Sequence, residues 1–410
     1  MRHKVLHILS QRPGLTGSGT TLDALVREAS PDWDQRVIVG VPADDPSPAV
    51  GNLPPDNSAI APLRFGPGGA VSYALPGMSD VMPYPSSRFS GLDASQLQAY
   101  RAAWRGHIAE VIASFAPDVI HSHHIWLMSS LLRDIAGDIP IVTHCHATGL
   151  RQMQLAPHLR DEVRRGCARN DHFVALHKGH RRELTDALDI PPERVTVVGA
   201  GFDEEVFHAR GRPNGAPAIL YAGKLSRAKG LPWLFEVFDI IAPRMPNVRL
   251  HVAGGGAGEE ARELAEQMAS LAPRVVYHGQ LAPPALADLM RQCSLFVLPS
   301  FYEGLPLVLV EAVACGCRAL STRLPGIVQG LADPLAGCLT LVDPPRLRGV
   351  DEPVPQDLPA FVERLLPVLE KAIARPLPKD TAKRVEPFRW PTIFGRVQAV
   401  WREQIAAARS

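Results

Sequence analysis

Short apolar runs alternate with longer amphipathic stretches along most of the chain. KVLHILS, RVIVGVP and PIVTHCH in the first half, and PAILYAGKL, VRLHVAGGG and SLFVLPS in the second, are rich in β-branched residues and leucine. The stretches between them carry apolar residues at helical spacing. This alternation is typical of a parallel sheet covered by helices, so the pattern predicts an α/β protein.

The alternation is interrupted once, near the middle. FHARGRPNGAPA, residues 207–218, is rich in Gly and Pro and has no apolar period, which indicates a hinge near residue 210. A chain of 410 residues is also too long for one ordinary core. We therefore expect a first domain over 1–207, a second over 208–387 and a working cleft between them. The tail predicts an amphipathic helix at about 388–408.

Composition and charge narrow the class of protein. The chain has 43 basic and 42 acidic residues, a formal net charge of +1, which gives no general field for binding nucleic acid. Its six cysteines form no CxxC pair, as expected of reduced cytoplasmic thiols. The N-terminal apolar run is too short for a signal peptide, and no run is long enough to span a membrane. We expect a cytoplasmic protein, at most peripheral to a membrane.

The segment PSFYEGLPLVLVEAVACG, residues 299–316, combines a loop with a helix that carries two acids. Pro306 suits a first helical turn, so the helix is predicted from about 306 to Gly316, with Glu311 in its second turn and Glu303 just before it. Free backbone N–H groups and the helix dipole favour an anion at this end. The predicted phosphate cradle consists of Gly304, Leu305, Leu307 and Val308.

Two lysines follow the first strand of the second half, in AGKLSRAKG. Lys224 and Lys229 fall at the carboxyl edge of the sheet, where open α/β sheets bind ligands. With the helix N-terminus they can neutralise a diphosphate without a metal ion. Glu303 and Glu311 can then accept hydrogen bonds from sugar hydroxyls on either side. No cofactor or metal is predicted.

These segments resemble the retaining GT-B glycosyltransferases of family 4. Glu303 and Glu311 within SFYEGLPLVLVEAVACG look like the family's E-x7-E motif, YAGKLSRAKG like its phosphate loop and FRWPTIFGRVQAVW like its C-terminal helix. The resemblance implies two Rossmann-like domains facing a cleft, with that helix crossing back onto the first. It also implies that Glu311 binds ribose, Glu303 the transferred sugar, and the lysines the diphosphate. The family usually has Arg where this chain has Lys224, so an ammonium point charge replaces a guanidinium group that could bind a phosphate through two hydrogen bonds.

The resemblance further implies the reaction and the donor. A sugar would move from a nucleotide diphosphate, with UDP favoured, to an acceptor by front-face displacement with retained configuration. The family grips uracil by backbone near the segment 279–281. The donor residues implied there are Gly279, Gln280 and Leu281, and Gly254 completes the predicted donor set.

The first half carries weaker candidates. Gly17, Ser18 and Gly19 follow the first strand and can let the backbone approach a phosphate or a sugar. Their spacing, G-x-x-G-x-G, reverses the usual dinucleotide fingerprint. The resemblance implies that His146 contacts the donor sugar and the reacting centre, so His146, Glu303 and Lys229 are the predicted catalytic residues. The predicted acceptor side comprises His121, His123, Arg151 and Arg164.

The same residues also allow structural interpretations. The acids can be solvated or capping groups, the glycines a tight turn, His146 a structural histidine and the arginines a solvated helix face. The clustered histidines invite a zinc site, but HxHH and HxH lack a closed tetrahedral set. The acceptor, small or lipid, is not identified; the arginines favour an anionic one.

Three other functions remain as alternatives. An epimerase or phosphorylase of the same fold would need its own acid, base or cofactor lysine. A nicotinamide-dependent oxidoreductase would need the first-half glycine loop to hold a dinucleotide. A non-catalytic protein would bind the nucleotide sugar without turnover.

Overall fold

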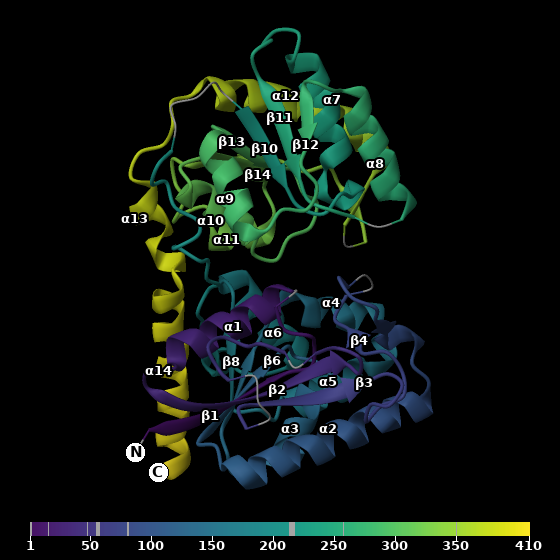
Figure 1. Ribbon diagram of the computed structural model, residues 1–410, viewed down its shortest axis with the longest axis vertical. Helices are drawn as coiled ribbons and strands as arrows, with labels where there is room; N and C mark the ends of the chain where they lie inside the picture. The colour runs from purple at the N-terminus through teal and green to yellow at the C-terminus, as the bar shows by residue number, and fades with distance from the viewer. Residues whose placement is uncertain are drawn as a thin grey trace. The chain divides into compact units, whose positions relative to one another are not determined.

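The computed structural model describes residues 2–14, 16–46, 48–54, 58–79, 82–212, 218–256, 258–349 and 351–410. Contacts divide the chain into two compact units (Figure 1). Unit 1 comprises Met1–Ala200 and Trp390–Ser410, and unit 2 comprises Gly201–Arg389. Each unit is built on one large parallel sheet, as the alternating pattern predicts. Residues 213–217 of the predicted hinge lie outside the described residues.

Unit 1 is built on a seven-stranded parallel sheet of order β3-β2-β1-β6-β7-β8-β9. Its strands are β1 His3–Leu9, β2 Trp33–Pro42, β3 Ile60–Phe65, β6 Val119–His123, β7 Ile141–His144, β8 His172–Ala175 and β9 Val195–Val197. Its helices are α1 Gly17–Ala29, α2 Ala94–Phe115, α3 Leu132–Ala136, α4 Ala147–Leu155, α5 Arg160–Cys167, α6 Lys178–Leu188 and α14 Trp390–Arg409. Two short strands, β4 Pro76–Gly77 and β5 Ser87–Arg88, form a separate pair.

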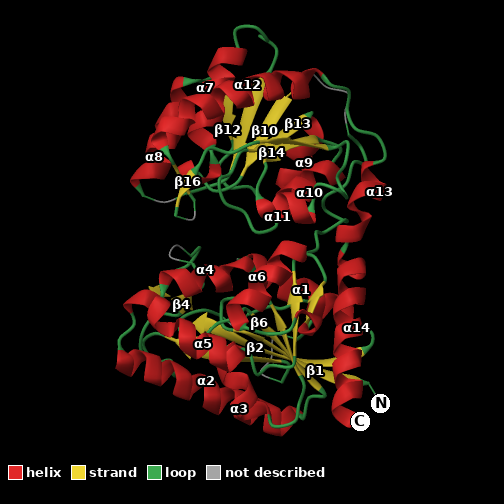
Figure 2. Ribbon diagram, turned by 180° about the vertical axis from the view of Figure 1, so that it is seen from behind, coloured by secondary structure: helices red, strands yellow, loops and turns green. Residues whose placement is uncertain are grey.

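Helices cover both faces of this sheet (Figure 2). Successive strand residues point to opposite faces, so Val5 of β1 packs in one core with Trp401 of α14, while Leu6 packs in another with Trp104 of α2. Burial on both faces explains why the strands are nearly continuous apolar runs. The C-terminal helix α14 therefore belongs to unit 1, where the family resemblance puts it.

Unit 2 has a six-stranded parallel sheet of order β12-β11-β10-β13-β14-β15. The strands are β10 Ala218–Ala222, β11 Arg249–Ala253, β12 Val275–Tyr277, β13 Leu295–Leu298, β14 Arg318–Thr322 and β15 Leu339–Val342, with a hairpin of β16 Leu347–Arg348 and β17 Glu352–Pro353. The helices are α7 Leu231–Ile241, α8 Glu259–Ser270, α9 Pro283–Gln292, α10 Leu307–Ala314, α11 Pro325–Gly330, α12 Leu358–Ala374 and α13 Thr381–Val385. One continuous core joins sheet and helices.

The boundary between the units differs from the predicted one. Unit 2 begins at Gly201 rather than 208 and ends at Arg389 rather than 387. Phe202 and Phe207 are buried in the unit 2 core, and the Phe202 backbone N–H donates to the Phe388 carbonyl at 2.9 Å. These apolar anchors, rather than the Gly and Pro content of the following segment, fix where the second unit starts.

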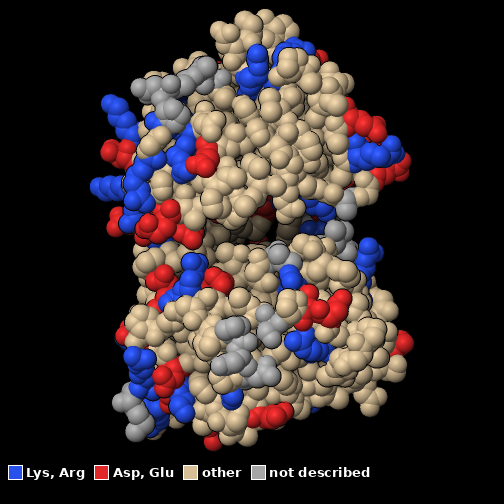
Figure 3. Space-filling view, in the orientation of Figure 1, with Lys and Arg blue, Asp and Glu red and all other residues tan. Residues whose placement is uncertain are grey.

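Basic and acidic side chains are interspersed on the face seen in Figure 3. All six cysteines are buried free thiols, and burial raises the pKa of Cys317 to about 11, so its thiol stays protonated at neutral pH. Within the described residues, every helix is too short or too polar to cross a bilayer.

Candidate active site

A pocket of about 370 Å³ lies at the carboxyl edge of the unit 2 sheet. Ala222, Ala253 and Leu298, the last residues of β10, β11 and β13, form part of its wall. Eight predicted donor-site residues also line it: Lys224, Lys229, Gly254, Gln280, Leu281, Glu303, Leu307 and Val308. Ligands of open parallel sheets bind outside the carboxyl ends of the strands, which is where this pocket lies.

Lys229 and Glu303 form an ion pair inside the pocket. The ammonium Nζ of Lys229 donates to Glu303 Oε1 at 2.7 Å, and both side chains are largely shielded, with 27% and 13% of their surface exposed. Lys229 ends a short turn that Gly230 closes with a φ of +74°. At that position a side chain would collide with the Pro299 carbonyl, so only glycine fits this close approach.

Lys224 lies on the same loop but makes no ion pair with any described acid. The Tyr221 hydroxyl donates to the backbone carbonyl of Lys224 at 2.6 Å, which anchors the loop to β10. The pocket therefore contains one paired ammonium and one that is available to an anion.

The helix after Glu303 begins one residue later than predicted. α10 spans Leu307–Ala314, and Pro306 is its extended N-cap, with a φ of −77° and a ψ of 94°. The backbone N–H groups of Leu307 and Val308 have no hydrogen-bond partner among the described residues, whereas that of Leu309 donates to the Pro306 carbonyl. Both residues line the pocket, so two unpaired amides of the first helical turn lie beside it, where an anion site would use them.

Two residues of the predicted phosphate cradle, Gly304 and Leu305, lie between the lining residues Glu303 and Pro306 without lining the pocket themselves. Instead, the Gly304 carbonyl packs against Gly326 of α11, where an added Cβ would lie 1.8 Å from that oxygen. The predicted helix end at Gly316 is also two residues too long, because Gly316 adopts a φ of +87° after the helix has stopped.

Glu311 lies in the second turn of α10 but does not line the pocket. Burial, reinforced by the negative charge of Asp203, raises the pKa of Glu311 to about 7. Asp203 comes from the first residues of unit 2 and was not predicted from the sequence, because nothing in the local pattern links it to α10. A carboxyl group with this pKa exchanges its proton near neutral pH and can donate as well as accept a hydrogen bond.

Glycine backbones form the floor of the pocket. Gly254 has a φ of +139°, and a Cβ there would lie 1.8 Å from the Gly223 carbonyl oxygen. The Gly254 N–H donates to the carbonyl of Gly279 at 2.8 Å. Gly279 itself is not in the lining, so it supports the pocket through this hydrogen bond while Gln280 and Leu281 contact the cavity.

The glycine segment of unit 1 is part of a helix rather than a loop. Gly17, Ser18 and Gly19 form the first turn of α1, and the hydroxyl of Thr16 caps the Gly19 N–H at 3.1 Å. An added Cβ at Gly19 would lie 2.6 Å from the Gly14 nitrogen. Gly19 thus permits close packing of the chain on the helix, and one of the predicted anion-binding amides is already capped.

The predicted histidines cluster at the ends of β6 and β7. His146 occupies the N-cap position of α4 without a side-chain capping hydrogen bond. Its ring stacks on that of His144 at 4.8 Å, and its Nε2 lies 3.1 Å from Nδ1 of His123. His146 reaches the surface in part, whereas His121 and His123 are fully buried. A direct role in lining the acceptor side, predicted for His121 and His123, does not fit this burial.

Arg160, Arg164, Arg165 and Arg169 recur at helical spacing in the sequence, but the structure does not bring this row to one point. Arg164 of α5 lies 3.9 Å from Asp189, while Arg169 donates to Asp134 at 2.6 Å. Arg151 lies on the neighbouring helix α4. Each of the two ion pairs is exposed and joins one arginine to a separate acid, which is typical of a solvated helix face.

Comparisons with known proteins point to one group. Residues 68–206 match the family model described as Glycosyltransferase Family 4, and residues 216–348 match Glycosyl transferases group 1. The chain is 27% identical over 300 residues to the D-inositol 3-phosphate glycosyltransferase of Stackebrandtia nassauensis, an alignment that covers 65% of this chain and 66% of that protein. The match thus spans slightly less than two thirds of that relative.

Solved structures show the same fold. Sucrose-phosphate synthase of Thermosynechococcus elongatus superimposes with a TM-score of 0.69 at 20% identity, covering 99% of this chain and all of that one. HepE of Anabaena, solved in complex with UDP, gives a TM-score of 0.61 at 16% identity, covering 98% of this chain and 100% of that one.

Proposed function

The chain belongs to the group 1 glycosyltransferases of family 4, and on this premise we propose that it transfers the sugar of a UDP-sugar to a small phosphorylated acceptor with retained configuration, releasing UDP. Its two parallel-sheet units have the GT-B fold. The observation that carries the proposal is the convergence of Lys224, Lys229, Glu303 and two free amides of α10 on one pocket.

Charge supports a diphosphate in this pocket. Two ammonium groups and a helix N-terminus oppose the negative charge of a nucleoside diphosphate. An ammonium carries three donors, so Lys229 can keep Glu303 and still donate to a phosphate oxygen. The second carboxylate oxygen of Glu303 is then available to a sugar hydroxyl. We propose that no metal ion takes part in this step.

UDP is the proposed donor nucleotide. Gln280 and Leu281 line the pocket beside the glycine floor and can contact a flat base. The neighbour HepE was solved with UDP, which supports the same nucleotide here. The pocket volume lies within the range of about 300–1,000 Å³ that is usual for small-molecule sites.

The proposed reaction is a front-face displacement. The bond between the anomeric carbon and the diphosphate oxygen breaks, and the acceptor hydroxyl oxygen forms its bond to the same carbon on the same face. The acceptor proton passes to the departing phosphate oxygen. Lys224, Lys229 and the α10 amides stabilise the charge that develops on the diphosphate, so no covalent enzyme intermediate is needed.

The acceptor class rests on the curated relatives. Those matched here are named D-inositol 3-phosphate glycosyltransferases, which supports a phosphorylated polyol as acceptor. Arg164 and Arg169, each next to an exposed acid, do not add to this support. Phosphorylated and unphosphorylated polyols should therefore be compared directly in turnover assays.

Calorimetric titration with UDP, GDP, ADP and NAD, in EDTA and in Mg²⁺, tests the donor. We expect UDP to bind equally well in both buffers and to bind weakly to Lys224→Ala, while the exposed loop variant Lys379→Ala retains wild-type affinity. Binding of NAD alone would overturn glycosyl transfer in favour of the oxidoreductase. NMR of the product then identifies the anomer, and an inverted anomer would contradict retention.

A further inference from the structure

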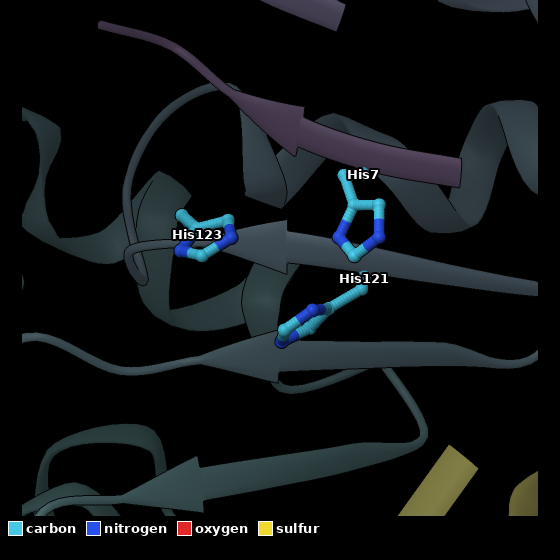
Figure 4. A group of neighbouring side chains, drawn as sticks. All are labelled: His7, His121 and His123. Atoms are coloured by element: carbon cyan, nitrogen blue, oxygen red, sulfur yellow. The ribbon is translucent and has the colours of Figure 1, made fainter. Parts of the chain in front are cut away.

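Three histidines from two neighbouring strands meet inside unit 1. β1 and β6 pair in parallel with His7 directly opposite His121, and His123 follows two residues later on the same face. One ring nitrogen from each residue lies within 4.8 Å of the other two (Figure 4). Sequence spacing alone could not reveal this set, because His7 lies far from the HxHH segment and joins it only through strand register.

All three rings are fully buried, yet four of their six nitrogens lack a hydrogen-bond partner. The unpartnered atoms are Nδ1 of His7, both nitrogens of His121 and Nε2 of His123. A buried polar atom without a partner costs about 1–3 kcal/mol. Such atoms are rarely retained in a core unless something binds them.

The hydrogen-bond network fixes which nitrogen of His7 is bare. The side-chain amide of Gln35 donates to the Val26 carbonyl at 3.0 Å and to the Ser30 hydroxyl at 3.2 Å, so its oxygen faces His7. That oxygen lies 3.2 Å from Nε2 of His7, which must therefore carry the proton. Nδ1 of His7 is left with an unused lone pair.

His123 has the same arrangement. Its Nδ1 lies 3.1 Å from Nε2 of His146, and its Nε2 is unpartnered. When Nδ1 donates to His146, Nε2 of His123 presents a lone pair to the cluster. Metal-binding histidines usually donate their other ring N–H in this way, which orients the ring and makes it a better ligand.

We propose that His7, His121 and His123 bind one divalent transition-metal ion, with zinc as the natural candidate. Imidazole nitrogens suit Zn²⁺, Co²⁺ and Ni²⁺, and three histidines with one further position make a known zinc coordination set. A water or hydroxide would occupy the fourth position and offset part of the ion's charge. Neutral imidazole is the form that coordinates metals.

The role of such an ion is structural. Trp401 of α14 packs edge-on against His7 at 5.5 Å and against His121 at 5.1 Å between ring centroids. The ion would therefore lie beneath the C-terminal helix, in unit 1, whereas the proposed donor pocket lies in unit 2. Metal binding should stabilise the docking of α14 and leave UDP affinity unchanged.

Metal analysis of the full-length chain, purified without a histidine tag, tests the proposal. We expect about one zinc per chain in the wild type, loss of it in His121→Leu and retention in His278→Asn. His278 is the matched control because its Nε2 lies 2.9 Å from Nδ1 of His251, in unit 2, so this pair could hold adventitious metal away from the cluster. Metal that is lost in His278→Asn but kept in His121→Leu overturns the site.

Reconstitution with cobalt covers the case in which His121→Leu does not fold. Protein unfolded in chelator and refolded with Co²⁺ should show the visible absorption of nitrogen-ligated cobalt and a raised melting temperature. Gln35→Leu keeps all three ligands but removes the partner of His7, and should weaken cobalt binding about 10–100-fold. Wild type that is isolated metal-free and shows neither cobalt signal excludes the site.

Discussion

Lys229 and Glu303 lie far apart in the sequence, yet their charged atoms are 2.7 Å apart in the proposed donor pocket. The pair joins the loop after β10 to the loop before α10. Each partner therefore has two roles, holding the other in place and presenting its remaining hydrogen-bonding capacity to a ligand.

Separate substitutions should distinguish these roles. Lys229→Ala removes a phosphate donor, so UDP affinity should fall by about 10–100-fold, the range for a charge-assisted hydrogen bond. Glu303→Gln keeps the shape but loses the charge, so UDP binding should change by less than about threefold while turnover of the UDP-sugar falls at least tenfold. Calorimetry and initial rates measure the two effects. Equal loss of UDP affinity in both variants would contradict the assignment of phosphate binding to Lys229 and of a role in turnover to Glu303.

Lys224 should bind a phosphate through its positive charge, without the paired hydrogen bonds that an arginine guanidinium can make. Lys224→Arg should keep UDP affinity within about threefold, because either cation can pair with a phosphate, whereas Lys224→Ala should lose about tenfold. The same calorimetric titration compares them, with Lys379→Ala as the surface control. A Lys224→Arg variant as weak as Lys224→Ala would mean that the pocket selects the ammonium by shape.

Glu311 should make the stability of unit 2 depend on pH. Its folded pKa, about 7, exceeds the usual value of an unfolded glutamate, so the stabilising contribution of the protonated form is complete below about pH 4.5 and is lost as pH rises to 7. Glu311→Gln lacks this loss. Between pH 4.5 and 8, its free energy of unfolding relative to that of the wild type should therefore rise by up to about 3 kcal/mol. Urea denaturation at several pH values measures it. Parallel profiles, matching those of the exposed control Glu363→Gln, would contradict the raised pKa.

Gly254 should not tolerate a side chain. A Cβ at this position meets the Gly223 carbonyl at 1.8 Å, and the φ of +139° is unfavourable to other residues. Gly254→Ala should destabilise the protein by about 2–4 kcal/mol and weaken UDP binding by distorting the pocket floor. Gly255→Ala is the matched control, since its nearest neighbour would lie at an ordinary 3.5 Å. Chemical denaturation and calorimetry should separate the two variants, and equal behaviour would argue against a close-approach role.

Trp401 should be a large contributor to unit 1. It is fully buried and packs edge-on against Trp33 at 5.0 Å between ring centroids. Trp401→Ala should cost about 3–5 kcal/mol, the usual range for a buried aromatic residue. The exposed neighbour Arg402→Ala should cost less than about 0.5 kcal/mol. Thermal and urea unfolding measure both, and a small effect at Trp401 would mean that α14 contributes little to the core.

The sequence predicted the features that depend on neighbours along the chain. Alternating apolar runs predicted both parallel sheets, and lysines placed just after a strand fell where strand ends form a pocket. Features set by strand register or long-range packing were missed. The pairing of His7 with His121 and the approach of Asp203 to Glu311 each need the folded chain. Helix bounds shifted by one or two residues, because Pro306 caps α10 from outside it.

The order of synthesis gives α14 a further consequence. The face of the first sheet that carries Val5, Val142 and Trp33 is covered partly by α1 and partly by α14. While a ribosome makes the protein, the part of this apolar surface that α14 covers stays exposed until all of unit 2 has been translated. Unit 2, whose chain is continuous, can complete its core first. A nascent chain halted before residue 390 would therefore carry an open hydrophobic face and become a client for chaperones.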